Sequence, residues 1–266
     1  MLPPFAVERP ADLADALTML SEDCIPYCGG TELLLAMKMG LLRPDALVDL
    51  KRLTELRGMR VDDQEFVIGA ATSHADIARS TLVSERLPLL AKVERRVGNA
   101  RVRSQGSIGG NLCFAEPRSD IATVLLALNA RLSLASTGST RRVAMADFID
   151  GAYSTARAAS ELLVDVRIPL PAPSGAYEKF QTAERPTVGV AVVRGLQGGV
   201  RIVLGAVGEM PLAFEFADLS GVEPEAIADG IDPIPDLTGS VRYKKHVTAT
   251  YIRRVLALLE TVKTDG

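Results

Sequence analysis

The strongest constraint on the fold lies in residues 24–50, where two short apolar runs enclose a pair of glycines and a helical segment. The first run, residues 24–28, reads as a strand that ends at the glycine pair. Residues 31–39 then read as a helix, and residues 45–50 as a second strand. Strand, glycine turn, helix and strand make a βαβ unit, which predicts two parallel strands.

The pattern changes after this unit, because strands and helices no longer alternate. The strands expected next are residues 65–71, 131–136, 141–145 and 161–168, and the helices are residues 10–21, before the unit, and 74–80, 87–97 and 120–128. Residues 106–111, followed by Glu116-Pro117, read as a loop that precedes the helix predicted from Asp120. This middle part is therefore predicted to be α+β and mostly antiparallel.

Residues 169–175 carry three prolines and a glycine and are expected to be a linker. The strands predicted beyond it are residues 176–182, 188–194 and 200–207, with a Gly198-Gly199 hairpin turn, and a final helix is predicted over residues 241–262. The domains expected are 1–170, divided into 1–54 and 55–170, and 175–266.

Composition excludes several classes of protein. The net charge is −3 and the basic residues are dispersed, so no nucleic-acid surface is expected. No signal peptide and no apolar run of the roughly 20 residues needed for a membrane span is visible. Three cysteines without framework spacing indicate reduced thiols, and a cytoplasmic location is expected. Cys24 and Cys28 lack enough further ligands for a metal site, so none is predicted.

The first glycine segment lies between a predicted strand and a predicted helix. Glycines let the backbone approach an anion, and a helix start presents N–H groups with a partial positive charge. A pyrophosphate would suit this place, although an ordinary βα turn has the same sequence pattern. The candidate binding residues are Cys28, Gly29, Gly30, Thr31, Glu32 and Leu33.

A second glycine segment precedes the helix predicted from Asp120. Three glycines and two small polar side chains predict another backbone cradle, and Asp120 could accept a hydrogen bond from a ribose hydroxyl. The alternative is a surface loop in which Asp120 only caps a helix. Two such segments fit a dinucleotide held from two sides better than two unrelated turns. The candidates here are Ser107, Ile108, Gly109, Gly110 and Asn111.

The remaining residues suggest no catalytic group. Neither segment has the Rossmann or Walker spacing of glycines. His74 has no recognisable catalytic partner in the sequence, and His246 is expected on the solvated face of a helix. A redox function would therefore need a bound cofactor.

In order along the chain, these motifs resemble the medium, FAD-binding subunit of the molybdenum hydroxylases, the family of carbon monoxide dehydrogenase and xanthine dehydrogenase. The resemblance is carried by residues 29–34, by residues 101–111 running into 115–120, by 161–169, by 177–180 and by 243–245. The chain differs from the family pattern at Cys28, where alanine is usual, and at Glu32, where aspartate or serine is common. Residues 183–187 lack the acidic residue that usually follows the arginine.

The resemblance implies an FAD-binding fold of the vanillyl-alcohol-oxidase (PCMH) type with a smaller C-terminal α+β domain. It implies non-covalent FAD, with both glycine segments around the pyrophosphate and Asp120 at the adenosine ribose. Leu163 and Lys179 would lie near the cofactor, and Thr72 is predicted as a further binding residue.

In that family a small subunit holds two 2Fe–2S clusters and a large subunit holds the molybdopterin cofactor. The implied function is an electron-transfer subunit that takes electrons from the 2Fe–2S clusters and passes them to NAD⁺, O₂ or another acceptor. One alternative is a self-sufficient flavoenzyme acting directly on a small molecule. Another is a nucleotide-binding scaffold that has lost flavin, against which the intact glycines argue.

Overall fold

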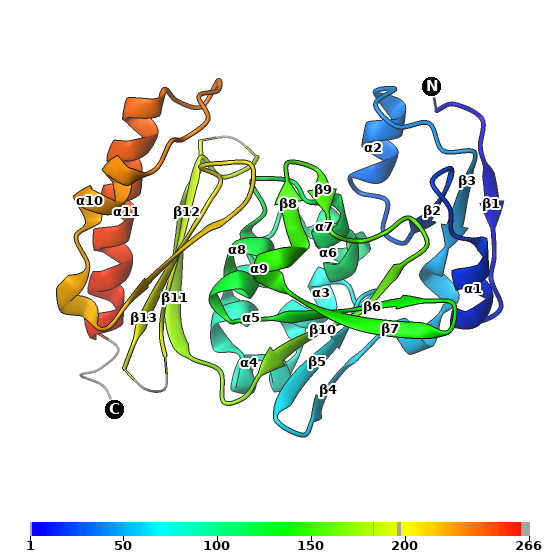
Figure 1. Cartoon of the computed structure of the whole chain (residues 1–266), viewed down its shortest axis with the longest axis horizontal. Coiled ribbons are helices and arrows are strands. Elements are labelled where there is room, and N and C mark those ends of the chain that lie inside the picture. Colours follow the sequence, from blue (N-terminus) through cyan, green and yellow to red (C-terminus); the bar gives the residue numbers. More distant parts are fainter. Residues whose placement is uncertain (1, 183, 196–197, 262–266) are drawn as a thin grey trace.

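The computed structural model describes residues 2–182, 184–195 and 198–261. Three parts follow one another across the molecule, from the N-terminal part at one end to the C-terminal part at the other (Figure 1). Each part is built on its own sheet, and a short ribbon of β8 (Ile149–Gly151) and β9 (Ser154–Thr155) is added to the middle part.

The N-terminal part is a parallel sheet with the strand order β1-β3-β2. Its elements are β1 (Ala6–Glu8), α1 (Leu13–Met19), β2 (Cys24–Tyr27), α2 (Leu33–Lys38) and β3 (Ala46–Asp49), followed by the short 3₁₀ turns Leu50–Arg52 and Thr54–Leu56. The predicted βαβ unit is confirmed. The sequence analysis missed β1, because all three of its residues are exposed and show no apolar alternation.

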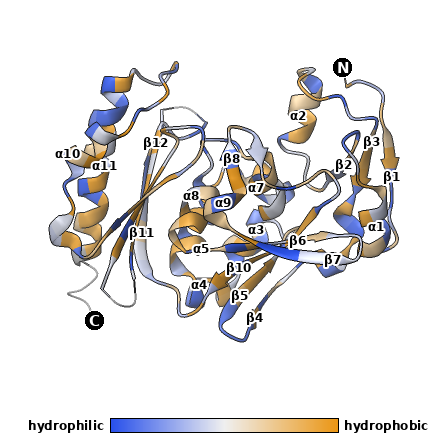
Figure 2. Cartoon of the chain, in the orientation of Figure 1, coloured by the Kyte–Doolittle hydropathy of each residue, from blue (hydrophilic) through white to orange (hydrophobic). Residues whose placement is uncertain are grey.

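The middle part is an antiparallel five-stranded sheet with the order β4-β5-β10-β6-β7. The prediction of mostly antiparallel strands is confirmed. Its strands are β4 (Met59–Asp62), β5 (Glu65–Gly69), β6 (Arg131–Ser136), β7 (Ser139–Ala144) and β10 (Leu162–Pro169). Its helices are α3 (His74–Arg79), α4 (Thr81–Arg86), α5 (Pro88–Glu94), α6 (Ala100–Gln105), α7 (Ile108–Phe114), α8 (Asp120–Ala127) and α9 (Met145–Phe148). Strand β7 is an exposed edge that carries charged residues, a common protection against edge pairing (Figure 2).

The C-terminal part is an antiparallel four-stranded sheet backed by a long helix. Its elements are β11 (Ser174–Phe180), β12 (Val188–Arg194), β13 (Val200–Gly205), β14 (Leu212–Phe216), a 3₁₀ turn (Leu219–Gly221), α10 (Pro224–Gly230) and α11 (Val241–Thr261). Strand β12 is apolar without alternation because both faces of the sheet are covered. Val190 and Val192 pack toward α11, whereas Ala191 and Val193 join the core around α8 (Figure 1).

Two expectations about secondary structure need correction. The segment predicted as a loop at 106–111 is mostly helical, since α6 ends at Gln105 and α7 begins at Ile108. Glycines in a sequence suggest a loop, but Ser107 caps α7 through its side chain and packing on the sheet fixes the helix. The linker predicted at 169–175 is shorter, because β10 continues to Pro169 and β11 starts at Ser174. The last helix was predicted to Val262, which lies outside the described residues.

A search of the residues described above finds no helix with both the length and the apolar character needed to span a bilayer.

Candidate functional site

The first glycine segment joins β2 to α2 and has a backbone that only glycine adopts readily. Gly30 has φ +68°, and a Cβ on it would lie 2.5 Å from the ring of Tyr27. The first intrahelical donor is the N–H of Leu34, which reaches the carbonyl of Gly30 (3.1 Å). The N–H groups of the residues just before Leu34 belong to a helix start, where no intrahelical acceptor exists. This segment therefore fits the anion-binding role predicted for it.

The two glycine segments lie directly against each other. A Cβ placed on Gly29 would come within 2.1 Å of the Gln105 carbonyl oxygen and 2.8 Å of Gly106 Cα. A Cβ on Gly106 would in turn lie 3.4 Å from Thr31 Oγ1. The approach at Gly29 is closed to any residue with a side chain, whereas the 3.4 Å distance at Gly106 is an ordinary contact. Tertiary folding thus brings together the two segments that the sequence places about 75 residues apart, so one extended ligand could contact both.

The second segment is not the open backbone cradle that the sequence suggested. The N–H of Ile108 donates to the carbonyl of Thr72 (3.1 Å), and that of Gly109 donates to the carbonyl of Ala70 (2.8 Å). The N–H groups of Gly110 and Asn111 donate to Ser107, at its hydroxyl and its carbonyl respectively. All four N–H groups are therefore occupied, two by carbonyls of residues 70 and 72 and two by the capping residue Ser107.

The second segment can still let a ligand approach its backbone closely, and it can offer polar side chains as hydrogen-bond partners. Gly110 is exposed, and a Cβ there would meet only Ser107 Oγ, at 3.0 Å. The Asn111 side chain is held beside it, because its Oδ1 accepts a hydrogen bond from Ser119 Oγ (2.7 Å). Gly109, by contrast, is buried against Ala70, so its lack of a side chain serves packing between α7 and the sheet.

Thr72 holds the start of the second segment through its backbone carbonyl. The Thr72 hydroxyl accepts a hydrogen bond from the N–H of Gly58 (2.9 Å) and donates one to the carbonyl of Gly58 (3.2 Å). The Thr72 carbonyl accepts a hydrogen bond from the N–H of Ile108. The side chain is buried and fully engaged within the chain. The structure thus places Thr72 beside the site, with its polar groups already used.

Asp120 lies at the start of α8 and is bound by two residues of β11. Tyr177 donates its hydroxyl to Asp120 Oδ1, and Lys179 Nζ lies 2.6 Å from Oδ2. Lys179 also donates to the carbonyl of Arg96 (3.3 Å). Asp120 and Lys179 each have a side chain 8% exposed, so their ion pair is buried. Each carboxylate oxygen has more than one lone pair, which leaves Asp120 able to accept from a further donor such as a hydroxyl.

Leu163 lies near the start of β10, at the end of the sheet where the second segment packs. It is buried in the main core, and the register of β10 against β6 shifts between Leu163 and Asp165. At this irregularity the carbonyl of Val164 accepts from the N–H of Ala70. The structure therefore brings Leu163 into the same region as the glycine segments.

A charged cluster that was not predicted from the sequence connects the C-terminal part to the first segment and to the turn between α7 and α8. Arg185 contacts Glu32 and Glu116, and Tyr153 and Arg118 complete the cluster around Glu116. Arg185 and Glu32 are 153 residues apart, so no local pattern could have revealed their pairing.

The two histidines have different environments. His74 Nδ1 lies 2.8 Å from Glu94 Oε2, and both side chains are buried. The backbone N–H of His74 donates to the carbonyl of Gly106 (3.1 Å), so the pair stands behind the second segment rather than on its surface. His246 is exposed on α11, as predicted.

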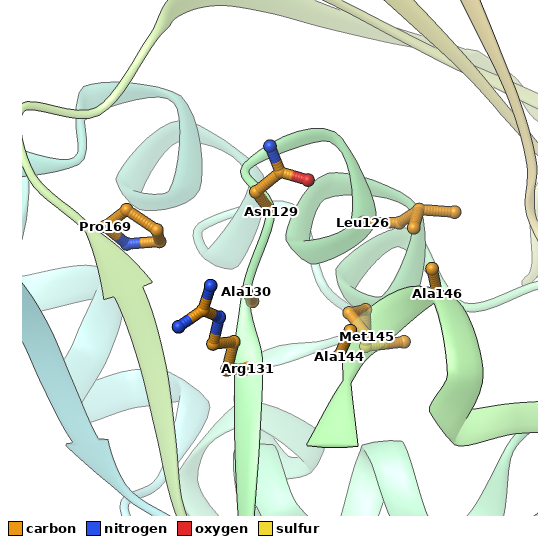
Figure 3. A pocket seen from close by; sticks show the side chains of 8 residues that line it. All are labelled: Leu126, Asn129, Ala130, Arg131, Ala144, Met145, Ala146 and Pro169. Carbon is orange, nitrogen blue, oxygen red and sulfur yellow. The ribbon is translucent and has the colours of Figure 1, made fainter. Parts of the chain in front are cut away.

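One cavity lies away from these residues (Figure 3). It has a volume of about 290 Å³ and is lined by Leu126, Asn129, Ala130, Arg131, Ala144, Met145, Ala146 and Pro169. Pro169 is six residues along β10 from Leu163, about 20 Å away at the rise of a strand. The cavity is therefore at the far end of the sheet and belongs to no predicted site residue.

Comparison with known proteins gives a family match over residues 3–171, to the family described as FAD binding domain in molybdopterin dehydrogenase. The medium chain of carbon monoxide dehydrogenase from Afipia carboxidovorans is 33% identical over 95% of both chains. The medium chain of glyceraldehyde dehydrogenase from Sulfolobus acidocaldarius is 30% identical over 93% of this chain and 95% of the relative.

A solved structure agrees with these matches. A chain of carbon monoxide dehydrogenase from Hydrogenophaga pseudoflava, in a form lacking the Mo-pyranopterin moiety of the molybdenum cofactor, superimposes with a TM-score of 0.87. The two chains are 31% identical, and the match covers 97% of each. The likeness thus includes the C-terminal part, beyond the residues of the family match.

Proposed function

Because the chain belongs to the family of FAD-binding medium subunits of molybdenum hydroxylase-type dehydrogenases, we propose that it is the electron-transfer subunit of such an oxidoreductase. It takes electrons from 2Fe–2S clusters in a small partner subunit, which receives them from a large molybdopterin subunit. It passes them to NAD⁺, O₂ or another acceptor. Bound FAD supplies the redox chemistry, and the chain supplies binding and orientation.

We propose that the cofactor lies along the line where the two glycine segments meet. The single observation that carries this proposal is the contact of Gly29 with Gln105 and Gly106, which no side chain could allow. Cys28 to Leu33 bind the pyrophosphate through the helix start, and Ser107 to Asn111 lie against it through the exposed Gly110 and the Asn111 side chain. Asp120 binds the adenosine ribose, and Thr72, Leu163 and Lys179 complete the site.

The division into domains 1–170 and 175–266 is part of the same proposal. All strands of the first two sheets precede residue 170, and the four strands of the third follow it. Asp120 and Lys179 come from different domains, so the adenosine end of the cofactor would lie where the two domains meet.

The cofactor is expected to be FAD, bound without a covalent bond. Cys113 is a poor candidate for attachment, because burial raises the pKa of its thiol to about 11 against the opposing charge of Arg157. The chain should show an oxidised flavin spectrum that bleaches with anaerobic dithionite, and denaturation should release free FAD. Colour that stays with the denatured chain would contradict non-covalent binding, and a colourless protein that FAD cannot reconstitute would contradict the site.

The partners are tested by native purification of the tagged chain from the cells that produce it. We expect a complex that contains FAD together with molybdenum, iron and acid-labile sulfide. A flavoprotein that elutes alone and oxidises a small molecule by itself would support the self-sufficient flavoenzyme instead. Metal analysis and the eluted mass separate these two outcomes without any knowledge of the substrate.

A further inference from the structure

Arg185, in the loop between β11 and β12, reaches the first glycine segment and the turn between α7 and α8. Its Nη2 donates to both carboxylate oxygens of Glu32, at 2.7 and 2.8 Å. Its Nη1 lies 3.5 Å from Glu116 Oε2. Glu32 belongs to the first segment, and Glu116 lies two residues beyond the end of α7, which the second segment begins. Arg185 thus joins three elements that are far apart in the sequence.

Glu116 is buried and negatively charged. Burial alone would favour its neutral form, but Arg185, Arg118 and the hydroxyl of Tyr153 lower its pKa below the usual value. The Tyr153 hydroxyl donates to Oε2 at 2.9 Å, and Arg118 Nε donates to Oε1 at 3.0 Å. Glu116 is therefore paired on both oxygens, whereas Glu32 depends on Arg185.

Glu32 does not act as a helix cap, the usual reason for an acidic residue at this place. It occupies the N-cap position of α2, yet its side chain makes no capping hydrogen bond and turns to Arg185 instead. A carboxylate next to a pyrophosphate would repel the ligand unless a positive charge neutralised it.

We propose that Arg185 is a positioning residue for FAD, which neutralises Glu32 beside the pyrophosphate and ties the first segment to Glu116 in the turn between α7 and α8. This inference rests on the binding site proposed above. It assigns a role to a residue outside both glycine segments, and it explains why a glutamate is tolerated in the first segment. Arg185 acts through Glu32 and Glu116 and needs no contact with FAD.

The test is a charge-compensation cycle of R185Q, E32Q and the double variant. FAD dissociation constants are measured by titrating each apoprotein and following flavin fluorescence. R185Q should bind FAD about tenfold or more weakly, because Glu32 is left unpaired beside a dianion. E32Q should bind at least as tightly as the wild type, and the double variant should recover most of the affinity that R185Q loses. The loss of FAD affinity caused by R185Q should be smaller at high salt, since salt screens a partly exposed charge.

A purely structural contact would give a different pattern. R185Q and E32Q would then weaken binding equally, and the double variant would recover nothing; that pattern overturns the proposal, as does wild-type affinity in R185Q. Thermal melting of each apoprotein shows whether it folds. R253Q breaks the exposed pair between Arg253 on α11 and Glu225 on α10, and as the matched control it should bind FAD like the wild type.

The same titration of Gly29→Ala separates two kinds of failure. If Gly29→Ala weakens FAD binding and R185Q does not, the site stands and the role of Arg185 is wrong. If neither variant changes FAD binding, the proposed site itself is wrong.

Discussion

Replacing Gly29 by alanine is expected to weaken FAD binding by about ten- to a hundredfold. The new methyl group would lie 2.1 Å from the carbonyl oxygen of Gln105, so the two glycine segments must move apart. Overpacking of this kind costs about 1 to 3 kcal/mol, and each 1.4 kcal/mol is a factor of about ten in affinity. Titration of the apoprotein with FAD measures the loss directly.

Gly230→Ala is the matched control for this variant. Gly230 ends α10, its φ is negative, and a Cβ there would have no neighbour within 4 Å. This substitution should leave both FAD affinity and melting temperature unchanged. Wild-type affinity in Gly29→Ala, with a normal melting temperature, would show that FAD does not depend on the contact between the segments.

Replacing Asp120 by alanine is expected to cause the largest loss of stability. The change leaves Lys179 as a buried charge without its carboxylate and removes the acceptor of the Tyr177 hydroxyl. Removal of one partner of a buried ion pair costs about 3 to 5 kcal/mol. For a chain of this size that corresponds to a fall in melting temperature of about 10 °C. Calorimetry of the apoprotein measures the effect without any contribution from FAD.

Two variants show where this loss comes from. Tyr177→Phe removes one hydrogen bond to the Asp120 carboxylate and leaves the ion pair, so it should cost about 1.5 to 3 kcal/mol, less than Asp120→Ala. Asp120→Ala combined with Lys179→Met removes both charges and should recover part of the stability, because no unpaired buried charge remains. A loss below about 1 kcal/mol in Asp120→Ala would mean that the pair does not hold β11 against α8.

Local patterns were enough to predict most of the strands and the main helices. The alternating and continuous apolar runs of β5, β6 and β12 were visible in the sequence, since strand period and burial are short-range properties. Strand β1 was invisible because its pairing with β3 depends on backbone hydrogen bonds alone. Helix α7 was read as loop because its glycines have low helix propensity, which tertiary packing overrides.

Some residues of the site could likewise be recognised from the sequence, and others could not. Gly30 could be recognised from the sequence because a positive φ is a local requirement that glycine meets. The pairing of Arg185 with Glu32 could not, since charged side chains carry no periodic signal and these two residues are 153 positions apart in the sequence. Asp120 was identified as a polar contact, but its partners on β11 were not.

By itself the sequence determined the types of most elements, the two glycine segments and the resemblance to a flavoprotein family. These depend on the identity and spacing of neighbouring residues, which set backbone conformation and burial locally. Only the tertiary structure decided that the segments touch, that the N–H groups of the second are occupied, and that Arg185 and Lys179 reach acids in other parts of the chain. Such contacts depend on the packing of the three sheets, because only packing brings residues distant in the sequence within hydrogen-bonding distance.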